Sequence, residues 1–189
     1  MKKLLYTLLA VSIIFSACEK EEEETNNSGN NNNSALAIGD THQGGIIFYL
    51  DGNGGGLIAA PSDYDTDTKE WGCFGTLISG ADGTAIGTGN QNTIDIEVGC
   101  TTSVTAADIC ANLTLGGYSD WFLPSKDELN EMYLNLHQQG LGSFNIGYYH
   151  WCSTEYNNFN AWGQRFLNGD QSNYDKSNTQ NYFRPVRAF

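Results

Sequence analysis

Short apolar runs separated by turn-forming residues open the folded part of the chain. Ile46 to Leu50 is one apolar run, Asp51 to Gly56 supplies turn residues, and Leu57 to Pro61 is a second apolar run. Two such runs joined by a Gly-rich turn are typical of a β-hairpin. From Ser62 to Cys100 the pattern breaks into Asp, Thr and Gly clusters around Trp71. This predicts a long irregular excursion with room for short strands only.

Two helices are predicted in the middle of the chain. Ser103 or Thr105 can cap a short, mostly apolar helix that runs through Leu113. Ser125 and Glu128 have the spacing of a capping box, which predicts a second helix from Lys126 to about His137. The apolar stripe of this helix, at positions i, i+3, i+4 and i+7, consists of Leu129, Met132, Tyr133 and Leu136.

The C-terminal third returns to strand patterns. Strands are predicted over residues 148–154, 161–167 and 182–189, with polar segments of Asn, Asp, Ser and Gln between them. No repeat of fixed period is present in the sequence. The 22 Gly, 10 Tyr, 9 Phe and 4 Trp indicate many turns that join short, aromatic-rich strands rather than a helical bundle. This composition excludes a collagen and a coiled coil.

The N-terminus has the features of an export signal. Lys2 and Lys3 precede an apolar run from Leu4 to Phe15, which is too short to span a bilayer but suits a secretory signal peptide. The small residues that lead into Cys18 resemble the lipobox of bacterial lipoproteins, in which the cysteine is acylated. We therefore predict a signal peptide over residues 1–17 and lipidation of Cys18. A plain signal peptide with a chance cysteine is the alternative.

Residues 18–37 are predicted to tether the domain to the lipid. The acidic run from Glu19 to Glu24 resembles the surface-export signal of Bacteroidota lipoproteins, and residues 25–37 are Asn-, Ser- and Gly-rich. A flexible coil of this length spans roughly 25 Å. These features predict a protein anchored in the outer membrane and facing outward, with its folded domain over residues 38–189. A charge run that only keeps the tether extended is the alternative.

The charge balance argues against two kinds of partner. The chain has 22 acidic and 9 basic side chains, a net charge of −13. Residues 38–189 alone carry 17 acidic and 6 basic side chains, a net charge of −11. Nucleic-acid binding depends on Lys and Arg side chains that release counterions from the phosphates. No nucleic-acid partner is therefore expected, nor direct binding of the domain to an anionic membrane surface.

Three segments resemble a known family. They are residues 117–129 (GYSDWFLPSKDEL), 149–155 (YHWCSTE) and 182–189 (YFRPVRAF). They are similar to the domain at the C-terminus of Legionella-type collagen-like adhesins, often left as a domain of unknown function. The resemblance implies an α+β, C-type-lectin-like fold, with two helices on small twisted antiparallel sheets and the first and last strands close together. Trp121, Leu123, Pro124 and Trp151 then build the core. The collagen stalk is absent from this sequence, so trimerisation does not carry over.

Four cysteines remain once Cys18 is lipidated. An even number in an exported domain predicts two disulfides, with three possible pairings. The resemblance to C-type lectins, which tie the first helix to a late strand, favours Cys110–Cys152 and leaves Cys73–Cys100. The spacings of 27, 10 and 42 residues contain no C-x-x-C pair, so a zinc site is not expected.

A calcium site is not predicted either. Asp63, Asp65 and Asp67 alternate like the start of a calcium loop. Thr68 and Phe74, however, occupy the positions where an EF-hand has Gly and Glu. The sequence also lacks the Glu-Pro-Asn, Gln-Pro-Asp and Trp-Asn-Asp motifs by which calcium-dependent C-type lectins hold sugars.

No active site is predicted. His150 and Cys152 alternate on a predicted strand and so face the same side, which makes them the nearest candidates for a catalytic pair. The related formylglycine-generating fold needs a reactive cysteine, and a disulfide at Cys152 would quench it. The sequence shows no motif of a hydrolase, metalloprotease or phosphate-binding loop, so we predict neither an enzyme nor a cofactor.

The segment between Glu155 and Phe183 has the composition of a binding surface. It combines Tyr and Trp, which give contact area at low entropy cost, with Asn and Ser, which give adaptable hydrogen bonds, as in antibody loops. For any single residue, a role in a turn or in the core is the alternative. The predicted ligand-binding residues are Tyr156, Asn158, Asn160, Trp162, Gln164, Asn168, Asp170, Asn173, Tyr174 and Asn178.

These features predict a surface-anchored, adhesin-like module that binds a glycan or protein ligand. The resemblance extends to lipoproteins diversified by retroelements, which scatter Asn codons into Tyr, Ser and Asp, and the residue mixture fits that scheme. The adhesin relatives imply sulfated glycans, but the charge of −11 opposes a polyanion unless Arg165, Arg184 and Arg187 cluster. A structural envelope lipoprotein without its own ligand pocket is the alternative.

Overall fold

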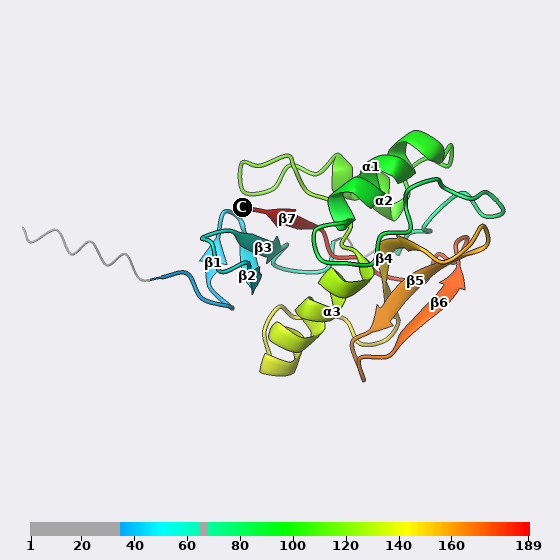
Figure 1. The fold of residues 1–189 in the computed structure, drawn as a ribbon. Helices are drawn as coiled ribbons and strands as arrows, with labels where there is room; N and C mark the ends of the chain where they lie inside the picture. Colours follow the sequence, from blue (N-terminus) through cyan, green and yellow to red (C-terminus); the bar gives the residue numbers. More distant parts are fainter. Residues whose placement is uncertain (1–34, 65–67) are drawn as a thin grey trace, which may run out of the picture. The chain divides into compact units, whose positions relative to one another are not determined.

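The computed structural model describes residues 35–64 and 68–189, and from Ala35 to Phe189 the chain forms one compact unit. The predicted signal peptide, the lipidation of Cys18 and nearly all of the tether lie outside the described residues. The unit is α+β: its described residues form two antiparallel sheets and three α-helices (Figure 1).

The first sheet joins the two ends of the domain. Its strand order is β1 (Thr41–His42), β2 (Gly45–Leu50), β3 (Gly56–Ala59) and β7 (Val186–Ala188), and all neighbours are antiparallel. The predicted hairpin is confirmed as β2 and β3. Figure 1 shows β7, the last strand, next to β3 near the chain's start. The first and last strands, β1 and β7, therefore belong to one sheet as expected, but they lie at its opposite edges.

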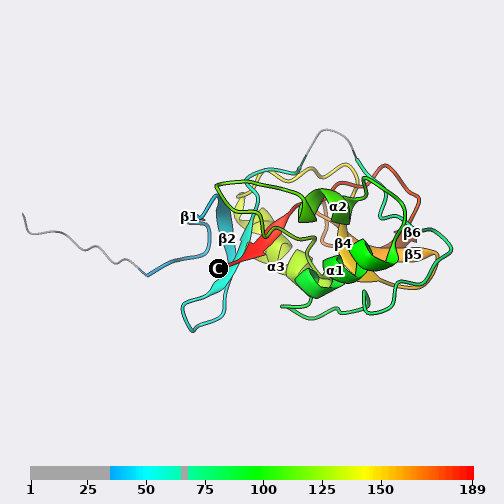
Figure 2. The same cartoon turned by 90° about the horizontal axis from the view of Figure 1, so that it is seen from above.

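The predicted second helix is confirmed as α3 (Lys126–Asn135), with a short 3₁₀ turn over His137–Gln139. The capping box forms as expected, because Ser125 Oγ accepts a hydrogen bond from Glu128 N while the Glu128 carboxylate accepts one from Ser125 N at 2.7 Å. The helix contacts β2 of the first sheet and β4 and β5 of the second (Figures 1 and 2). Its apolar stripe therefore fills the core between the sheets.

The first predicted helix is confirmed as α2 (Ala106–Ala111), with Thr105 as its cap. A third helix, α1 (Gly89–Gly99), contradicts the prediction of an irregular segment there. Sequence periodicity misses α1 because its buried face is largely polar: Asn92 donates to Gly83 O at 2.7 Å, and Thr93 Oγ1 accepts from Leu123 N. Such hydrogen bonds let amide and hydroxyl groups take core positions.

The second sheet consists of β4 (Tyr149–Glu155), β5 (Asn160–Arg165) and β6 (Gln171–Asp175), in that order and antiparallel. β4 and β5 confirm two predicted strands within a few residues. β6 corrects the prediction of a polar spacer, because this short polar segment pairs with β5 along its whole length. The last predicted strand, residues 182–189, is reduced to β7.

Trp121 and Trp151, which were expected in the core, are buried, and so is Trp71. Trp121 is 2% exposed, and Trp71 and Trp151 are fully buried. Each indole N–H has a backbone partner; Trp71 Nε1, for example, donates to Cys152 O at 2.9 Å. Buried indoles with a satisfied N–H are stable core anchors. The core assignments of Trp121 and Trp151 are confirmed.

One of the two favoured disulfides is confirmed and the other is wrong. Cys73 and Cys100 are bonded, whereas Cys110 and Cys152 are free and buried. Cys110 packs in the same core cluster as Trp151, while Cys152 packs in the cluster that surrounds α3. Because successive residues of a strand face opposite sides, Cys152 points away from the cluster that holds Cys110.

Candidate ligand-binding surface

The turn between β4 and β5 exposes two aromatic side chains on a fixed backbone. Asn157 Oδ1 accepts hydrogen bonds from the backbone N–H groups of Phe159 and Asn160, both at 2.8 Å. An Asn that bonds to the backbone ahead of it stabilises a turn. Tyr156 is 53% exposed and Phe159 is 47% exposed. The turn therefore presents aromatic area in a conformation already ordered before any ligand binds.

A second loop packs against this turn and adds another exposed aromatic residue. Phe74 is 51% exposed, and its ring centroid lies 5.3 Å from that of Phe159. Gly75 N donates to Asn158 O at 2.8 Å. The disulfide of Cys73 ties the start of the loop to the end of α1. The loop and the turn thus form one surface although they are far apart in sequence.

A buried ion pair supports this surface from below. Lys176 and Glu155 form a salt bridge with both side chains almost fully buried, and Lys176 Nζ lies 4.6 Å from the centroid of the Trp71 ring. Lys176 also donates from Nζ to Thr76 O at 2.8 Å and from its backbone N–H to Phe159 O at 2.9 Å. One residue therefore bonds to both segments that carry the exposed phenylalanines.

Next to the turn, the α3 side of the second sheet carries a cluster that we call the aromatic shelf. The shelf consists of Lys126, Tyr156, Asn160, Trp162 and Asn173. Tyr156 meets Trp162 edge to face at 5.3 Å, and Lys126 Nζ lies 3.7 Å from the centroid of the Trp162 ring. Asn160 Nδ2 donates to Asn173 Oδ1 at 3.2 Å. Indole, phenol, amide and ammonium groups meet here at a half-exposed site, which suits a ligand with both apolar and hydrogen-bonding parts.

Among the predicted binding residues, Gln164 is buried. It is 0% exposed, and its Nε2 donates to Asn130 Oδ1 of α3 at 2.9 Å and to Gly169 O at 3.3 Å. Gln164 therefore joins the sheet to α3 rather than facing solvent. We remove it from the predicted set of ligand contacts.

Other predicted residues lie away from the shelf. Tyr174 lies on the opposite face of the sheet, where its ring is 4.3 Å from that of Tyr149. Tyr149 Oη donates to Asp170 Oδ2 at 2.7 Å, and Asn168 Oδ1 accepts from Asp170 N within the β5–β6 turn. Asn178 follows β6 and accepts a hydrogen bond from Gln180 N. The structure thus brings together Tyr156, Asn158, Asn160, Trp162 and Asn173, and separates Asn168, Asp170, Tyr174 and Asn178 from them.

The sequence reasoning missed Phe74 and Lys126 as members of this surface. Phe74 precedes the C-terminal segment by about eighty residues of sequence, and Lys126 begins α3. The disulfide-forming Cys73 next to Phe74 was the one available signal, because a disulfide in an exported domain fixes its neighbours.

The arginines do not form the cluster that a sulfated polyanion would require. Arg184 is buried, and its Nε and Nη2 atoms each lie 2.8 Å from Asp63 Oδ1. Arg187 pairs with Asp120 through two hydrogen bonds, at 2.6 and 2.9 Å. Both therefore brace the last strand and are neutralised by a carboxylate.

The described residues contain neither a candidate metal site nor a candidate membrane-spanning helix. Among them, no group of three or more His, Cys, Asp or Glu side chains is placed to hold a metal ion. No α-helix of residues 35–64 and 68–189 is long and apolar enough to cross a membrane.

His150 and Cys152 are buried and do not form an activated pair. Cys152 Sγ donates to Trp162 O at 3.2 Å, and burial raises the pKa of its thiol to about 12. A thiol with so high a pKa carries almost no thiolate at neutral pH, and the thiolate is the nucleophile. The geometry does not favour nucleophilic chemistry at Cys152.

The buried charges around His150 give the domain a pH-dependent stability. Burial lowers the pKa of His150 and outweighs the attraction of Asp63, whose Oδ1 lies 2.9 Å from Nε2; Arg184 and His137 lower it further. Burial alone would raise the pKa of Asp63, but His150 and Arg184 outweigh it and hold that pKa below its ordinary value.

We therefore expect acid to destabilise the domain in two stages. A lowered folded-state pKa means that the unfolded state binds more protons, so stability is lost as pH falls. For His150 the loss begins below its ordinary pKa of about 6.5, and for Asp63 below about 4. Melting temperatures of residues 35–189 between pH 7.5 and 3.5 measure this. In His150→Gln the decline between pH 6.5 and 5 should flatten, and an unchanged profile would contradict the assignment to His150.

Comparison with known families matches residues 78–187 to the Lcl C-terminal domain. The match covers more than half of the chain, so the chain belongs to the Lcl C-terminal domain family, as the three sequence segments had indicated. The family is an adhesin-associated domain and not a known enzyme family. No curated protein matches the chain. The hairpin of β2 and β3 lies outside the matched residues, although β3 pairs with β7, whose first two residues lie inside them.

Proposed function

We propose that the chain is a surface-anchored, adhesin-like binding module that holds its ligand on the aromatic shelf and the adjoining turn. The observation that carries this proposal is the exposure of Tyr156, Phe159 and Phe74 on backbone held by hydrogen bonds and a disulfide. Exposed aromatic side chains that gather in one patch mark interaction sites, and groups ordered beforehand lose little entropy on association. Membership of an adhesin-associated family supports the same function.

We favour a glycan without sulfate groups as the ligand, with a protein as the alternative. Planar amides, an indole and a phenol are the groups that hydrogen-bond to and stack against sugar rings, and the shelf contains all three. The paired arginines and the net charge of −11 over residues 38–189 oppose a sulfated polyanion.

The anchor, orientation and fold type belong to the same proposal. The lipobox-like Cys18 and the acidic tether support an outer-membrane lipoprotein that faces outward. Two small antiparallel sheets with adjacent chain ends support a C-type-lectin-like fold. The mixture of Asn, Tyr, Ser and Asp between Glu155 and Phe183 supports diversification by a retroelement. Diversification would be contradicted if the genome neighbourhood lacked both a reverse transcriptase gene and a near-copy of the 3′ end of this protein's gene.

A glycan array tests the function directly. Residues 35–189, which form one compact unit, are applied with and without EDTA, beside the variant Tyr156→Ala. We expect saturable binding to non-sulfated glycans that EDTA leaves unchanged and that the variant loses. Binding confined to sulfated glycans would contradict the ligand class. Silence across the array, followed by an empty pull-down from host and bacterial surface extracts, would favour an envelope scaffold without a ligand.

A further inference from the structure

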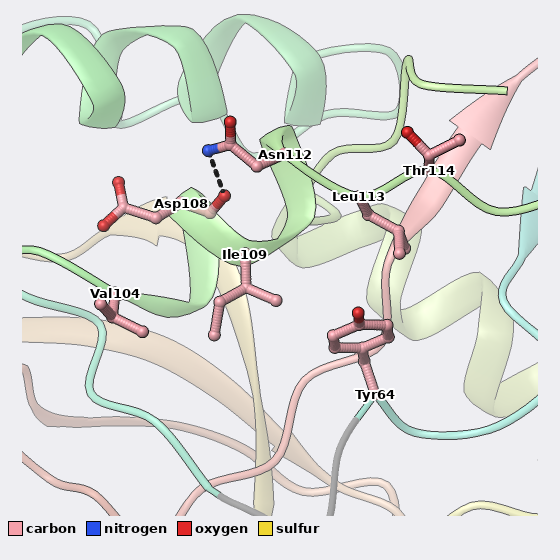
Figure 3. A pocket seen from close by; sticks show the side chains of 7 residues that line it. All are labelled: Tyr64, Val104, Asp108, Ile109, Asn112, Leu113 and Thr114. Carbon is pink, nitrogen blue, oxygen red and sulfur yellow. Dashed lines mark hydrogen bonds between the residues drawn. The ribbon is translucent and has the colours of Figure 1, made fainter.

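A hollow next to α2 is separate from the aromatic shelf and shares no residue with it. Its volume is about 490 Å³, within the range of small-molecule sites, which runs from about 300 to 1,000 Å³. The apolar part of its lining comes from Tyr64, Val104, Ile109 and Leu113 (Figure 3). Tyr64 is held in place, since its backbone N–H donates to Phe183 O at 3.2 Å and its ring lies 6.1 Å from that of Phe183.

The remaining lining residues are polar. Among the described residues, these are Asp108, Asn112 and Thr114. Asn112 Nδ2 donates to Asp108 O at 2.8 Å, the bond drawn in Figure 3, and Asp108 Oδ2 accepts from Thr105 N at 3.0 Å. These bonds fix both side chains and leave Asn112 Oδ1 with room for a further donor. The Asp108 carboxylate is also hydrogen-bonded to the Glu97 side chain, whose pKa burial and Asp108 raise to about 7. A carboxylate, an amide and a hydroxyl group therefore stand beside an aromatic and aliphatic surface.

Val104, which lines the same hollow, has a strained backbone conformation. It has φ of +63° and its side chain is 58% exposed. The left-handed region is unfavourable for an L-residue, and a β-branched residue there is a genuine outlier. Val104 directly precedes the helix cap Thr105, where an apolar side chain can pack against Ile109. That packing explains an apolar residue but not the strained backbone, and strained residues concentrate at ligand sites.

We propose that this hollow binds a single neutral sugar residue. The Tyr64 ring and the aliphatic side chains suit the C–H face of a pyranose, while Asp108, Asn112 and Thr114 suit its hydroxyl groups. Asp108 is the only charged residue among those described at the hollow, and it repels sulfate, phosphate and carboxylate groups. The proposal does not depend on the aromatic shelf, since the two sites can bind or fail separately.

Nuclear magnetic resonance titration of residues 35–189 tests the proposal. The probes are methyl β-galactopyranoside, methyl α-mannopyranoside and N-acetylglucosamine, each to about 50 mM, which detects a Kd of a few millimolar. We expect at least one of them to shift the backbone amides of residues 104–114. Absence of such shifts with all three would overturn the proposal. A stronger response to galactose 6-sulfate or to N-acetyl-lysine amide would overturn the neutral-sugar assignment.

Matched variants separate binding from folding. Val104→Asn places a residue that tolerates the left-handed region, and Val98→Asn makes the same change at an exposed position of α1. We expect Val104→Asn and Asn112→Ala to weaken sugar binding at least fivefold with the melting temperature kept, and Val98→Asn to bind as the wild type. Equal binding by all three variants would overturn the site. Tyr156→Ala should leave these shifts intact, which distinguishes this site from the shelf.

Discussion

Replacing Lys176 by Met is expected to lower the free energy of unfolding by about 3–5 kcal/mol, the range found when one partner of a buried ion pair is removed. Lys176 is fully buried and its partner Glu155 is 5% exposed, so the variant leaves a carboxylate in the interior without its counter-charge. Glu155 Oε1 keeps only the hydrogen bond from Ile78 N, at 2.9 Å. Urea denaturation of residues 35–189 measures the loss.

The double variant Lys176→Met with Glu155→Gln is the matched control. The amide of Gln keeps an acceptor for Ile78 N but carries no charge, so the cost of an unpaired charge disappears. We expect the double variant to regain most of the lost stability. A loss below about 1 kcal/mol in Lys176→Met, or a double variant as unstable as the single one, would contradict a structural role for this pair.

Reduction of Cys73–Cys100 is expected to destabilise the domain by about 3.5 kcal/mol, the chain-entropy value for a loop of this length. The bond closes a loop with a sequence separation of 27 residues that contains Phe74 and α1. Its loss frees the Phe74 loop from α1, so the exposed aromatic surface becomes less ordered. We therefore expect ligand binding at the shelf to weaken together with the stability. Denaturant unfolding with and without dithiothreitol measures the change in the free energy of unfolding.

The variant Cys73→Ser with Cys100→Ser is the control for the reductant. It should match the reduced wild type, and dithiothreitol should leave its stability unchanged. In unfolded, unreduced protein, alkylation should label Cys110 and Cys152 but not Cys73 or Cys100. Labelling of Cys73 and Cys100, or protection of Cys110 and Cys152, would contradict the pairing.

Local signals of the sequence predicted several elements correctly. The capping box of Ser125 and Glu128 specifies the start of α3, and the Gly-rich turn specifies the β2–β3 hairpin. Both depend on residues that are neighbours in the chain. In α1 and β6 no such local signal exists. In α1, tertiary hydrogen bonds of Asn92 and Thr93 take the place of an apolar pattern. In β6, pairing with β5 does so.

The candidate site was predictable in its composition but not in its geometry. The exposed Tyr156 and the half-buried Trp162 lie together as expected, whereas Gln164 is buried and Tyr174 faces the other side. Which side chain faces α3 depends on strand register, and a shift of one residue reverses the face. Phe74 joins the surface only through long-range contacts that composition cannot show.

The alternation of side-chain faces along a strand also explains why the predicted Cys110–Cys152 disulfide is wrong. Cys110 and Cys152 lie on the correct elements for a bond between a helix and a late strand. Adjacent residues of β4 face opposite cores, and Trp151 rather than Cys152 faces the cluster of Cys110. A spacing argument alone carries no information about which face is used.

The most direct test of ligand binding at the shelf compares two tyrosine variants of residues 35–189. Tyr156→Ala removes an exposed phenol of the shelf, and Tyr174→Ala makes the same change on the opposite face of the sheet. Isothermal titration calorimetry measures each affinity for the ligand that the array selects. We expect Tyr156→Ala to weaken binding at least about tenfold, as loss of an aromatic hot spot does, and Tyr174→Ala to bind as the wild type. Equal affinities, or loss in Tyr174→Ala alone, would contradict binding at the shelf.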